Sequence, residues 1–273
     1  MTRPGAAHPL QAALNGTRGP GESAAVPHDP AALAGAAAEA VAAGAHEVRL
    51  RPRTSCGAGS LSPRVVGPAL TAVRGRVRVP VTVPADAWAE PDPERRVARI
   101  RSWEALPERA WVPWHEPGAE ETAAALLARG VAVEAGLRPD TPGPALFTRS
   151  PLAPRVRRIA VEVPAGTGDA NGPAPTAPVD DLVAWLRALM AGADGPTGAD
   201  GPTGRWGRAP AGRCGGAPVL VYGTGAAAWP VLRLARRLGL AGRIGLEDTL
   251  LLPDGTRAGS TAEQVRAALS GSF

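Results

Sequence analysis

The 273-residue sequence contains no lysine, because all 30 of its basic residues are arginine. A chain without lysine cannot form a Schiff base, which excludes lysine-dependent aldolases and pyridoxal-phosphate enzymes. It also cannot build a phosphate-binding loop of the Walker type, which needs a lysine after its glycines. Several large enzyme classes are therefore excluded at the outset.

Cysteine is nearly absent as well. Cys56 and Cys214 are too few for a disulfide scaffold or a four-thiolate zinc site. The sequence has no run of about 18 uncharged apolar residues, so we expect no membrane-spanning helix and no membrane partner. The first residues lack the continuous apolar core of a signal peptide. These features favour a reduced, cytoplasmic protein.

The hydrophobic content of the sequence indicates a folded protein with a sizeable apolar core. Hydrophobic residues make up 44% of the chain and the mean hydropathy is −0.06, which is typical of a globular protein. A net charge of +5 and a pI of about 10.6 raise the question of nucleic acid. The arginines are scattered, however, and the aromatic residues show no stacking pattern, so we expect no nucleic-acid partner.

Short apolar stretches alternate regularly with helical patterns. Strands are expected at 10–14, 46–51, 77–83, 110–114, 131–135, 156–163, 217–222 and 241–245, and helices at 29–44, 62–74, 92–105, 118–129, 140–150, 179–190, 226–238 and 261–269. Asp29-Pro30, Ser62-Pro63 and Asp92-Pro93 are typical helix starts. Eight strand–helix units predict an α/β fold, a single-domain (β/α)₈ TIM barrel over residues 10–270.

Two stretches do not fit this alternation. Residues 164–178 are rich in Pro, Gly and Ala, and residues 191–216 contain a tandem repeat of GADGPT. Neither can bury enough apolar surface to order itself. We expect both to be flexible insertions on the barrel surface.

The functional site of such a barrel lies at the carboxyl ends of its strands. Polar candidates there are Asn15, Arg18, Arg49, Arg51, Arg53, Asp86, His115, Glu116, Glu134, Glu162, Tyr222, Thr224, Arg243, Glu247 and Asp248. The adjacent carboxylates Glu247 and Asp248 are the best pair, since one can bind a metal while the other acts as a base. Arg243 can keep a carboxylate ionised or bind an anionic substrate. The alternative for the pair is an acidic cap of the following loop.

His115 and Glu116 have two interpretations. They follow the fourth strand and so can contact a substrate at the mouth. Equally, they precede Pro117 and can cap the next helix.

Four segments together resemble the β-keto acid cleavage enzyme family, whose best-known activity is the cleavage of 3-keto-5-aminohexanoate. These are LNGTR near the start, AWAEPDPERR (87–96), WHEPGAEE (114–121) and RIGLEDTLLLPDG (243–255). The GLED stretch followed by the LPDG turn is the most specific of them. The resemblance extends over almost the whole barrel, apart from the two insertions, and it too implies a TIM barrel.

The resemblance implies a metal-dependent lyase, usually with Zn²⁺, in which a small anionic β-keto acid exchanges its acetate unit onto acetyl-CoA. The products are acetoacetate and a new CoA thioester, and the metal acts as a Lewis acid. Two histidines of an H-x-H motif on the second strand and the GLED glutamate hold the metal. Glu247 matches that glutamate, Asp248 the base and Arg243 the arginine that supports the base. Family members are commonly homo-oligomers.

The sequence departs from this pattern at the metal site. The two histidine positions are Arg49 and Arg51, and a family aspartate position is Thr54. Arginine stays protonated and offers no lone pair to a metal. Further departures are Pro84, Pro113 and Thr224, which stand where a serine, an asparagine and a glutamate are expected.

Arg49, Arg51 and Arg53 alternate along the second strand, so we expect all three to point into the barrel. Buried guanidinium groups need partners, and the expected ones are Glu247, Asp248, Glu134 and Glu162. Two hypotheses follow. One is an active lyase with altered metal ligation, built around Glu247 and His115. The other is a metal-free, catalytically weak or inactive barrel that binds an acidic metabolite. For the site as a whole, the residues expected to contact the substrate are Asn15, Arg49, Arg51, Arg53, His115 and Glu116.

Overall fold

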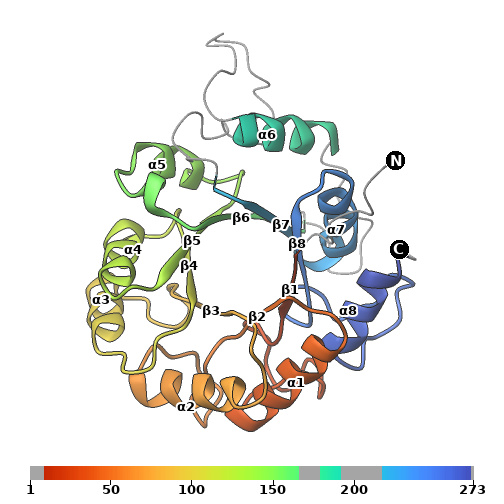
Figure 1. Cartoon of the computed structure of the whole chain (residues 1–273), viewed down its shortest axis with the longest axis horizontal. Helices are drawn as coiled ribbons and strands as arrows, with labels where there is room; N and C mark the ends of the chain where they lie inside the picture. Colours follow the sequence, from red (N-terminus) through yellow and green to blue (C-terminus); the bar gives the residue numbers. More distant parts are fainter. Residues whose placement is uncertain (1–8, 166–178, 192–216, 272–273) are drawn as a thin grey trace.

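The structure, a computed structural model, describes residues 9–165, 179–191 and 217–271. Eight parallel strands follow one another around a closed barrel in chain order, and the last pairs with the first (Figure 1). The strands are β1 (Leu10–Ala13), β2 (Glu47–Arg49), β3 (Val81–Pro84), β4 (Arg109–Pro113), β5 (Ala132–Leu137), β6 (Arg158–Val163), β7 (Val219–Gly223) and β8 (Ala241–Ile244). The predicted (β/α)₈ barrel is confirmed.

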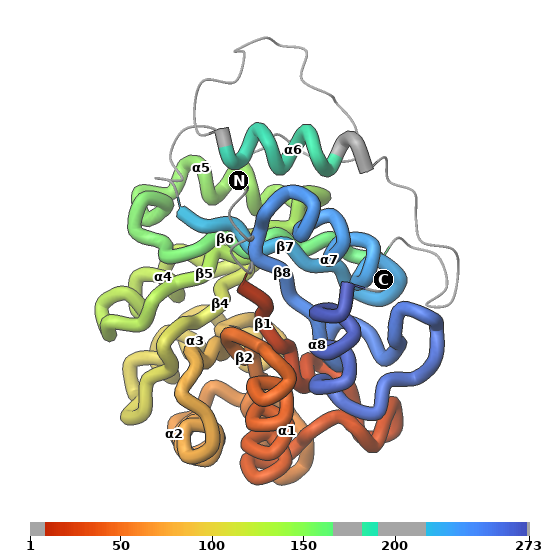
Figure 2. Tube along the Cα trace, turned by 45° about the vertical axis from the view of Figure 1, so that its right-hand side comes forward, coloured from red at the N-terminus to blue at the C-terminus, as the bar shows by residue number. Residues whose placement is uncertain are grey.

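A ring of helices surrounds the barrel, and the last helix returns beside the first (Figure 2). The helices are α1 (Pro30–Ala42), α2 (Pro63–Arg74), α3 (Pro93–Arg101), α4 (Ala119–Ala128), α5 (Gly143–Arg149), α6 (Val179–Ala191), α7 (Ala228–Arg237) and α8 (Thr261–Ser270), with short 3₁₀ turns η1 (Ala153–Arg155) and η2 (Gly225–Ala227). Among the described residues, no helix is both long and apolar enough to cross a membrane.

Two of the three predicted helix starts are capped by their side chains. Asp29 accepts a hydrogen bond from the backbone of Ala32 at 2.9 Å. Asp92 accepts from the two backbone N–H groups that follow Pro93. Ser62 stands at the start of α2 but makes no side-chain cap hydrogen bond. The proline after each cap fixes the first helical turn.

Two strands, β2 and β3, are each three residues shorter than expected, and each has a local reason. β3 begins at Val81 rather than at residue 77, because Pro80 has no N–H to donate to the ladder. β2 ends at Arg49 rather than at residue 51. Beyond it, the backbone of Arg51 bonds to the side-chain amide of Asn15 and not to a neighbouring strand. Asn15 donates to the Arg51 carbonyl and accepts from the Arg51 N–H, at 2.9 Å each.

The expected insertions at 164–178 and 191–216 lie almost entirely outside the described residues, and so does Cys214. Their predicted flexibility and surface position therefore remain predictions. The barrel itself begins at Leu10, and α8 ends at Ser270.

The strands alternate between an apolar outer face and a largely polar inner face. Outward residues such as Val48, Val83 and Val161 are fully buried against the helices. The largest side chain of this layer, Trp103, is 1% exposed and donates its indole N–H to the carbonyl of Leu61 at 2.8 Å. Burial of this apolar layer stabilises the contact between the barrel and its helices.

The amino-terminal end of the barrel interior is closed by a network of charged side chains. Glu47 at the start of β2 accepts hydrogen bonds from two nitrogens of Arg158, at 2.5 and 2.7 Å, and from Arg109. Arg158 also donates to Glu134 at 2.5 Å, and Glu134 accepts from Thr82 at 3.2 Å. Glu47, Arg109 and Arg158 are the first residues of β2, β4 and β6. Thr82 and Glu134 lie near the starts of β3 and β5, so the network spans the barrel.

The position of Glu134 corrects an expectation. We expected it at the carboxyl-end mouth, as a partner of the β2 arginines. Because β5 runs on to Leu137, Glu134 lies near the start of its strand and pairs with Arg158 at the opposite end.

We predict that Glu47→Gln destabilises the protein by about 3–5 kcal/mol at neutral pH, because Arg158 loses a buried partner. Burial alone raises the pKa of Glu47, but the hydrogen bonds and charge of Arg158 lower it below its usual 4.5. A lowered folded-state pKa stabilises the protein above the usual value and loses that effect as the pH falls. The difference between wild type and variant, measured by urea unfolding, therefore narrows below about pH 4.5.

The matched control is Glu39→Gln on the exposed face of α1, which should change stability by less than about 0.5 kcal/mol. An equal loss of unfolding free energy in both variants would contradict a structural role for the network.

Candidate active site at the mouth of the barrel

A tight turn after β8 brings two carboxylates to the mouth. Gly245 approaches β1 so closely that a Cβ there would lie 1.9 Å from the carbonyl oxygen of Ala13. The backbone N–H of Glu247 donates to the same carbonyl at 3.2 Å. The turn closes when the N–H of Asp248 donates to Gly245 at 2.9 Å. Only glycine permits this approach, which places both carboxylates beside β1 and β2.

Arg243 and Asp248 form a buried ion pair beneath the mouth. The Nη2 atom of Arg243 lies 2.5 Å from Oδ1 of Asp248, and Nε lies 3.2 Å from both carboxylate oxygens. The guanidinium carbon is 3.3 Å from the ring centre of Tyr222. Neither member of the pair is more than 2% exposed. Burial and the neighbouring Glu247 charge together raise the pKa of Asp248 to about 6, although Arg243 opposes the rise.

Glu247 is surrounded by guanidinium groups. Its two oxygens accept from Nε of Arg49 at 3.1 and 3.2 Å. Arg51 and Arg243 approach the same carboxylate to 3.6 and 3.9 Å. Burial alone would raise the pKa of Glu247, but these positive charges, Arg49 first among them, lower it to about 2. Glu247 is thus ionised and already engaged.

Arg51 has a second partner on the neighbouring strand. Its Nη1 atom lies 2.6 Å from Asp86, which follows β3. The indole ring of Trp88 lies 5.2 Å from the guanidinium carbon of Arg51 and 5.0 Å from that of Arg53. With 37% of its surface exposed, Trp88 forms the outer edge of this side of the mouth.

Arg53 behaves differently from the prediction. It lies beyond the end of β2 and donates to the backbone carbonyls of Gly16, Arg18 and Gly57 at 2.7–2.9 Å. Its partners are loop carbonyls rather than carboxylates, so the expectation of three arginines alternating along one strand was wrong for this residue. The side chain of Asn15, a predicted substrate contact, holds the backbone of Arg51.

Three further predicted residues come from β6 and from the turn after β4. Glu116 accepts from the backbone N–H of Ala87 at 2.7 Å, and burial raises its pKa. Glu162 accepts from the hydroxyl of Tyr222 at 2.9 Å, so the expectation that it pairs with the β2 arginines was wrong. His115 is half-buried, and its Nδ1 atom has no hydrogen-bond partner among the described residues. Burial and the charge of Arg138 lower the pKa of His115.

Two features of the mouth were not predicted from the sequence. Asp86 was a candidate without a role, and it is the strongest partner of Arg51. Trp111 lies beneath Arg49, with 4.4 Å between its ring centre and the guanidinium carbon. The alternation of β4 places Trp111 inside the barrel, but sequence spacing does not reveal how deep it lies.

The residues at the mouth do not fit the divalent metal that the resemblance implies. Arg49 and Arg51 stand at the two histidine positions and offer no lone pair, while both oxygens of Glu247 are bonded to Arg49. Within the described part of the chain, no three His, Cys, Asp or Glu side chains gather as a metal would require. A divalent ion at ~4.5 Å from one guanidinium would be repelled by about 7 kcal/mol at an effective dielectric of ~20.

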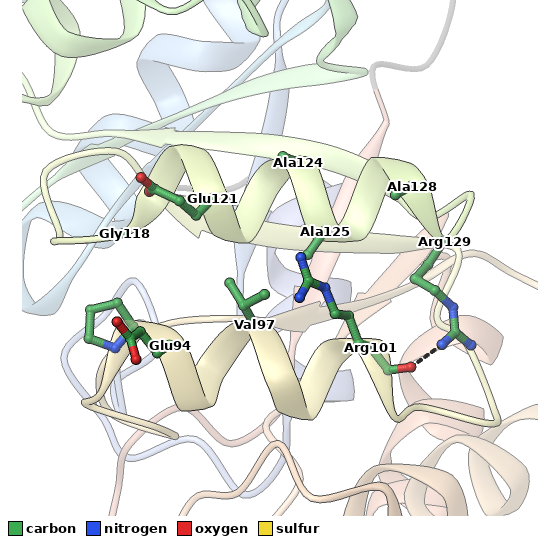
Figure 3. A pocket seen from close by; sticks show the side chains of 10 residues that line it. Glu94, Val97, Arg101, Gly118, Glu121, Ala124, Ala125, Ala128 and Arg129 are labelled. Carbon is green, nitrogen blue, oxygen red and sulfur yellow. Dashed lines mark hydrogen bonds between the residues drawn. The ribbon is translucent and has the colours of Figure 1, made fainter.

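A cavity of about 800 Å³ lies elsewhere, on the outer surface between α3 and α4 (Figure 3). Val97, Ala125 and Ala128 line its middle, and Arg129 donates to the carbonyl of Arg101 at one end. It contains none of the residues of the mouth, so we place the candidate site at the mouth and not in this groove.

Comparison with known proteins supports the resemblance. Residues 208–270 match the model of the beta-keto acid cleavage enzyme family, a segment that includes Arg243, Glu247 and Asp248. The resemblance stated from the sequence is confirmed over this segment. The chain has no match among curated proteins.

Solved structures of ObcA share the fold. A ternary complex of ObcA with a C4-CoA adduct and oxalate matches with a TM-score of 0.60 and 15% identity, covering 91% of this chain and 64% of that one. A binary complex with oxaloacetate matches at 0.59 and 17%, covering 91% and 63%. A dimeric archaeal Rubisco from Hyperthermus butylicus matches at 0.50 and 15%, covering 97% and 61%. The chain thus spans less than two thirds of the length of these structures, which share its barrel.

We predict that Gly245→Ala destabilises the protein by about 3 kcal/mol or more, because the new Cβ would overlap the Ala13 carbonyl. The measurement is the free energy of unfolding in urea. Gly19→Ala is the control, since a Cβ there meets no atom within 4 Å. Unchanged stability of the Gly245 variant would show that the turn does not depend on this close approach.

Proposed function

We propose that the mouth of this barrel catalyses β-keto acid cleavage, with a small β-keto acid as substrate and acetyl-CoA as the acceptor. The observation that carries the proposal is the buried Arg243–Asp248 pair beside Glu247, within the segment that matches the family model. The ObcA complexes with oxaloacetate and with a C4-CoA adduct support a keto acid and a CoA thioester as the kinds of ligand.

Asp248 is the proposed base. The carbon between the keto group and the carboxylate of a β-keto acid carries its most acidic proton, so a carboxylate facing it can start the reaction. In the overall exchange, the bond between the keto carbon and this carbon breaks. The acetate unit joins the acetyl group to give acetoacetate, and the CoA sulfur takes the remaining acyl group. Every atom of the two reactants is recovered in the two products.

Arg243 is the proposed positioning residue. It holds both oxygens of Asp248 and is itself packed against the ring of Tyr222. This support fixes the direction of the base, which general-base catalysis requires. Arg49 and Arg51 supply positive charge beside Glu247. This charge stabilises a substrate carboxylate or a developing enolate oxygen.

The other candidates have more limited roles in this proposal. The Nδ1 atom of His115 has no hydrogen-bond partner in the described part of the chain, and we retain His115 as a substrate-contacting residue. Asn15 and Glu116 bond backbone groups, and Arg53 does the same, so we propose that they shape the loops around the substrate. No step of the proposal passes through a metal.

A binding protein without turnover is the second candidate. It is favoured by one observation: both oxygens of Asp248 and both oxygens of Glu247 are already bonded to arginine. Asp248 is also 0% exposed, so it must become accessible before it can accept a proton from the substrate. If it does not, the mouth binds an acidic metabolite and releases it unchanged.

We predict that the purified protein converts oxaloacetate or another short β-keto acid in the presence of acetyl-CoA, and that Asp248→Asn lowers kcat by about 10²–10⁴-fold. Product formation is followed as acetoacetate. Because asparagine has the shape of aspartate, KM should change little if the residue acts as the base.

Asp254→Asn is the matched control, because Asp254 is a fully exposed carboxylate in the turn that follows. It should retain wild-type kcat. If the wild type binds the keto acid but forms no acetoacetate, the proposed catalysis is contradicted and binding without turnover is supported.

A further inference from the structure

The mouth contains a set of buried N–H groups that have no hydrogen-bond partner among the residues the structure describes. Arg49 is 1% exposed and uses its Nε atom for Glu247, while its Nη1 atom has no hydrogen-bond partner. The Nε atom of Arg51 lies 3.6 Å from Glu247, too far for a hydrogen bond. The indole N–H of Trp111, whose ring packs against Arg49, has no acceptor either.

Unsatisfied buried donors are uncommon in folded proteins, and each one calls for an explanation. Here the three side chains are neighbours, because Arg49 contacts Trp111 and shares Glu247 with Arg51. All three atoms donate and none accepts. A ligand that satisfies them must present acceptor oxygens, and a carboxylate does so with two.

The position of the unsatisfied donors also favours an anion. Arg49, Arg51 and Arg243 are matched by Glu247, Asp86 and Asp248, so the cluster itself is close to neutral. Two of the three unsatisfied N–H groups belong to the guanidinium groups of Arg49 and Arg51. At this point of the mouth a carboxylate is attracted and a divalent cation is repelled.

We propose that the guanidinium groups of Arg49 and Arg51, with the indole N–H of Trp111, form a metal-independent binding site for the carboxylate of a small organic acid. The fixed positive charge of the two arginines takes the place that a divalent ion would have. The inference rests on the proposed function only for the class of ligand. The site requires that the ligand has a carboxylate group, and it does not require that the ligand is cleaved.

Malonate is a suitable probe, since it is a short dicarboxylate that has no keto group to cleave. Wild-type protein should bind it by calorimetry with the same Kd in the presence of a chelator and in the presence of added Zn²⁺. Binding should also change the tryptophan fluorescence, because Trp111 lies under Arg49. A Kd that requires Zn²⁺, or no binding of malonate or of oxaloacetate, would overturn the proposal.

The double variant Arg49→His/Arg51→His tests the same site from the opposite direction. It replaces two cations by two imidazoles beside a released Glu247, which is a ligand set suited to zinc. We expect the affinity for malonate to fall at least 10-fold and one Zn²⁺ per chain to remain after dialysis. Arg49→Gln/Arg51→Gln is the matched control, which should lose malonate binding without gaining zinc.

A folded histidine variant that binds no zinc would show that the two side chains do not converge on Glu247, and would overturn the proposal. If either variant fails to fold, the chelator experiment on wild type still decides. Failure of the proposed function gives a different result. If the protein binds malonate but forms no acetoacetate from oxaloacetate, the proposed catalysis is contradicted and the proposed binding site is not.

Discussion

The ion pair between Arg49 and Glu247 is the contact on which the mouth of this barrel depends. Glu247 reaches β2 only because Gly245 lets the turn after β8 approach Ala13. Once there, its charge is shared among Arg49, Arg51 and Arg243. Removal of this one carboxylate would leave Arg49 buried without an ion-pair partner, whereas Arg51 and Arg243 would keep Asp86 and Asp248.

The same principle is repeated at the other end of the barrel. Most barrel interiors are filled with layers of branched apolar side chains, but here Glu47, Arg158 and Glu134 close the amino-terminal end. Between the two charged ends lies a small apolar layer of Trp111, Ala160, Leu220 and Tyr222. Arginine suits both ends, because it stays charged when buried and its several donors can serve two carboxylates at once.

Much of the fold could be predicted from the sequence, because it depends on periodicity and on capping residues. The eight strands and eight helices stand close to their expected ranges, and Asp29 and Asp92 cap helices as expected. The confirmed resemblance covers the segment with Arg243, Glu247 and Asp248. Local signals of this kind need no knowledge of the packed molecule.

The depth of a residue along the barrel could not be predicted in this way. Glu134 and Glu162 were expected at the carboxyl ends of their strands as partners of the β2 arginines, but the sequence pattern gives no register between strands. Glu134 therefore lies at the wrong end for the β2 arginines, and Glu162 meets Tyr222. The early end of β2 depends on Asn15, 36 residues from Arg51 in sequence, and no window around Arg53 contains that information.

The resemblance implies histidines where Arg49 and Arg51 stand, and two arginines there have a physical logic that a single one would lack. One arginine beside one remaining histidine would weaken a metal site by repulsion and still leave a guanidinium group competing with the metal for Glu247. With two arginines, both cations find carboxylates, Arg49 with Glu247 and Arg51 with Asp86. Glu247 then keeps a role as the counter-charge of the arginines. The chemistry that we propose for the mouth is recognition of an anion by fixed guanidinium groups beside a buried carboxylate. Whether Asp248 becomes accessible to the substrate then decides whether recognition is followed by cleavage.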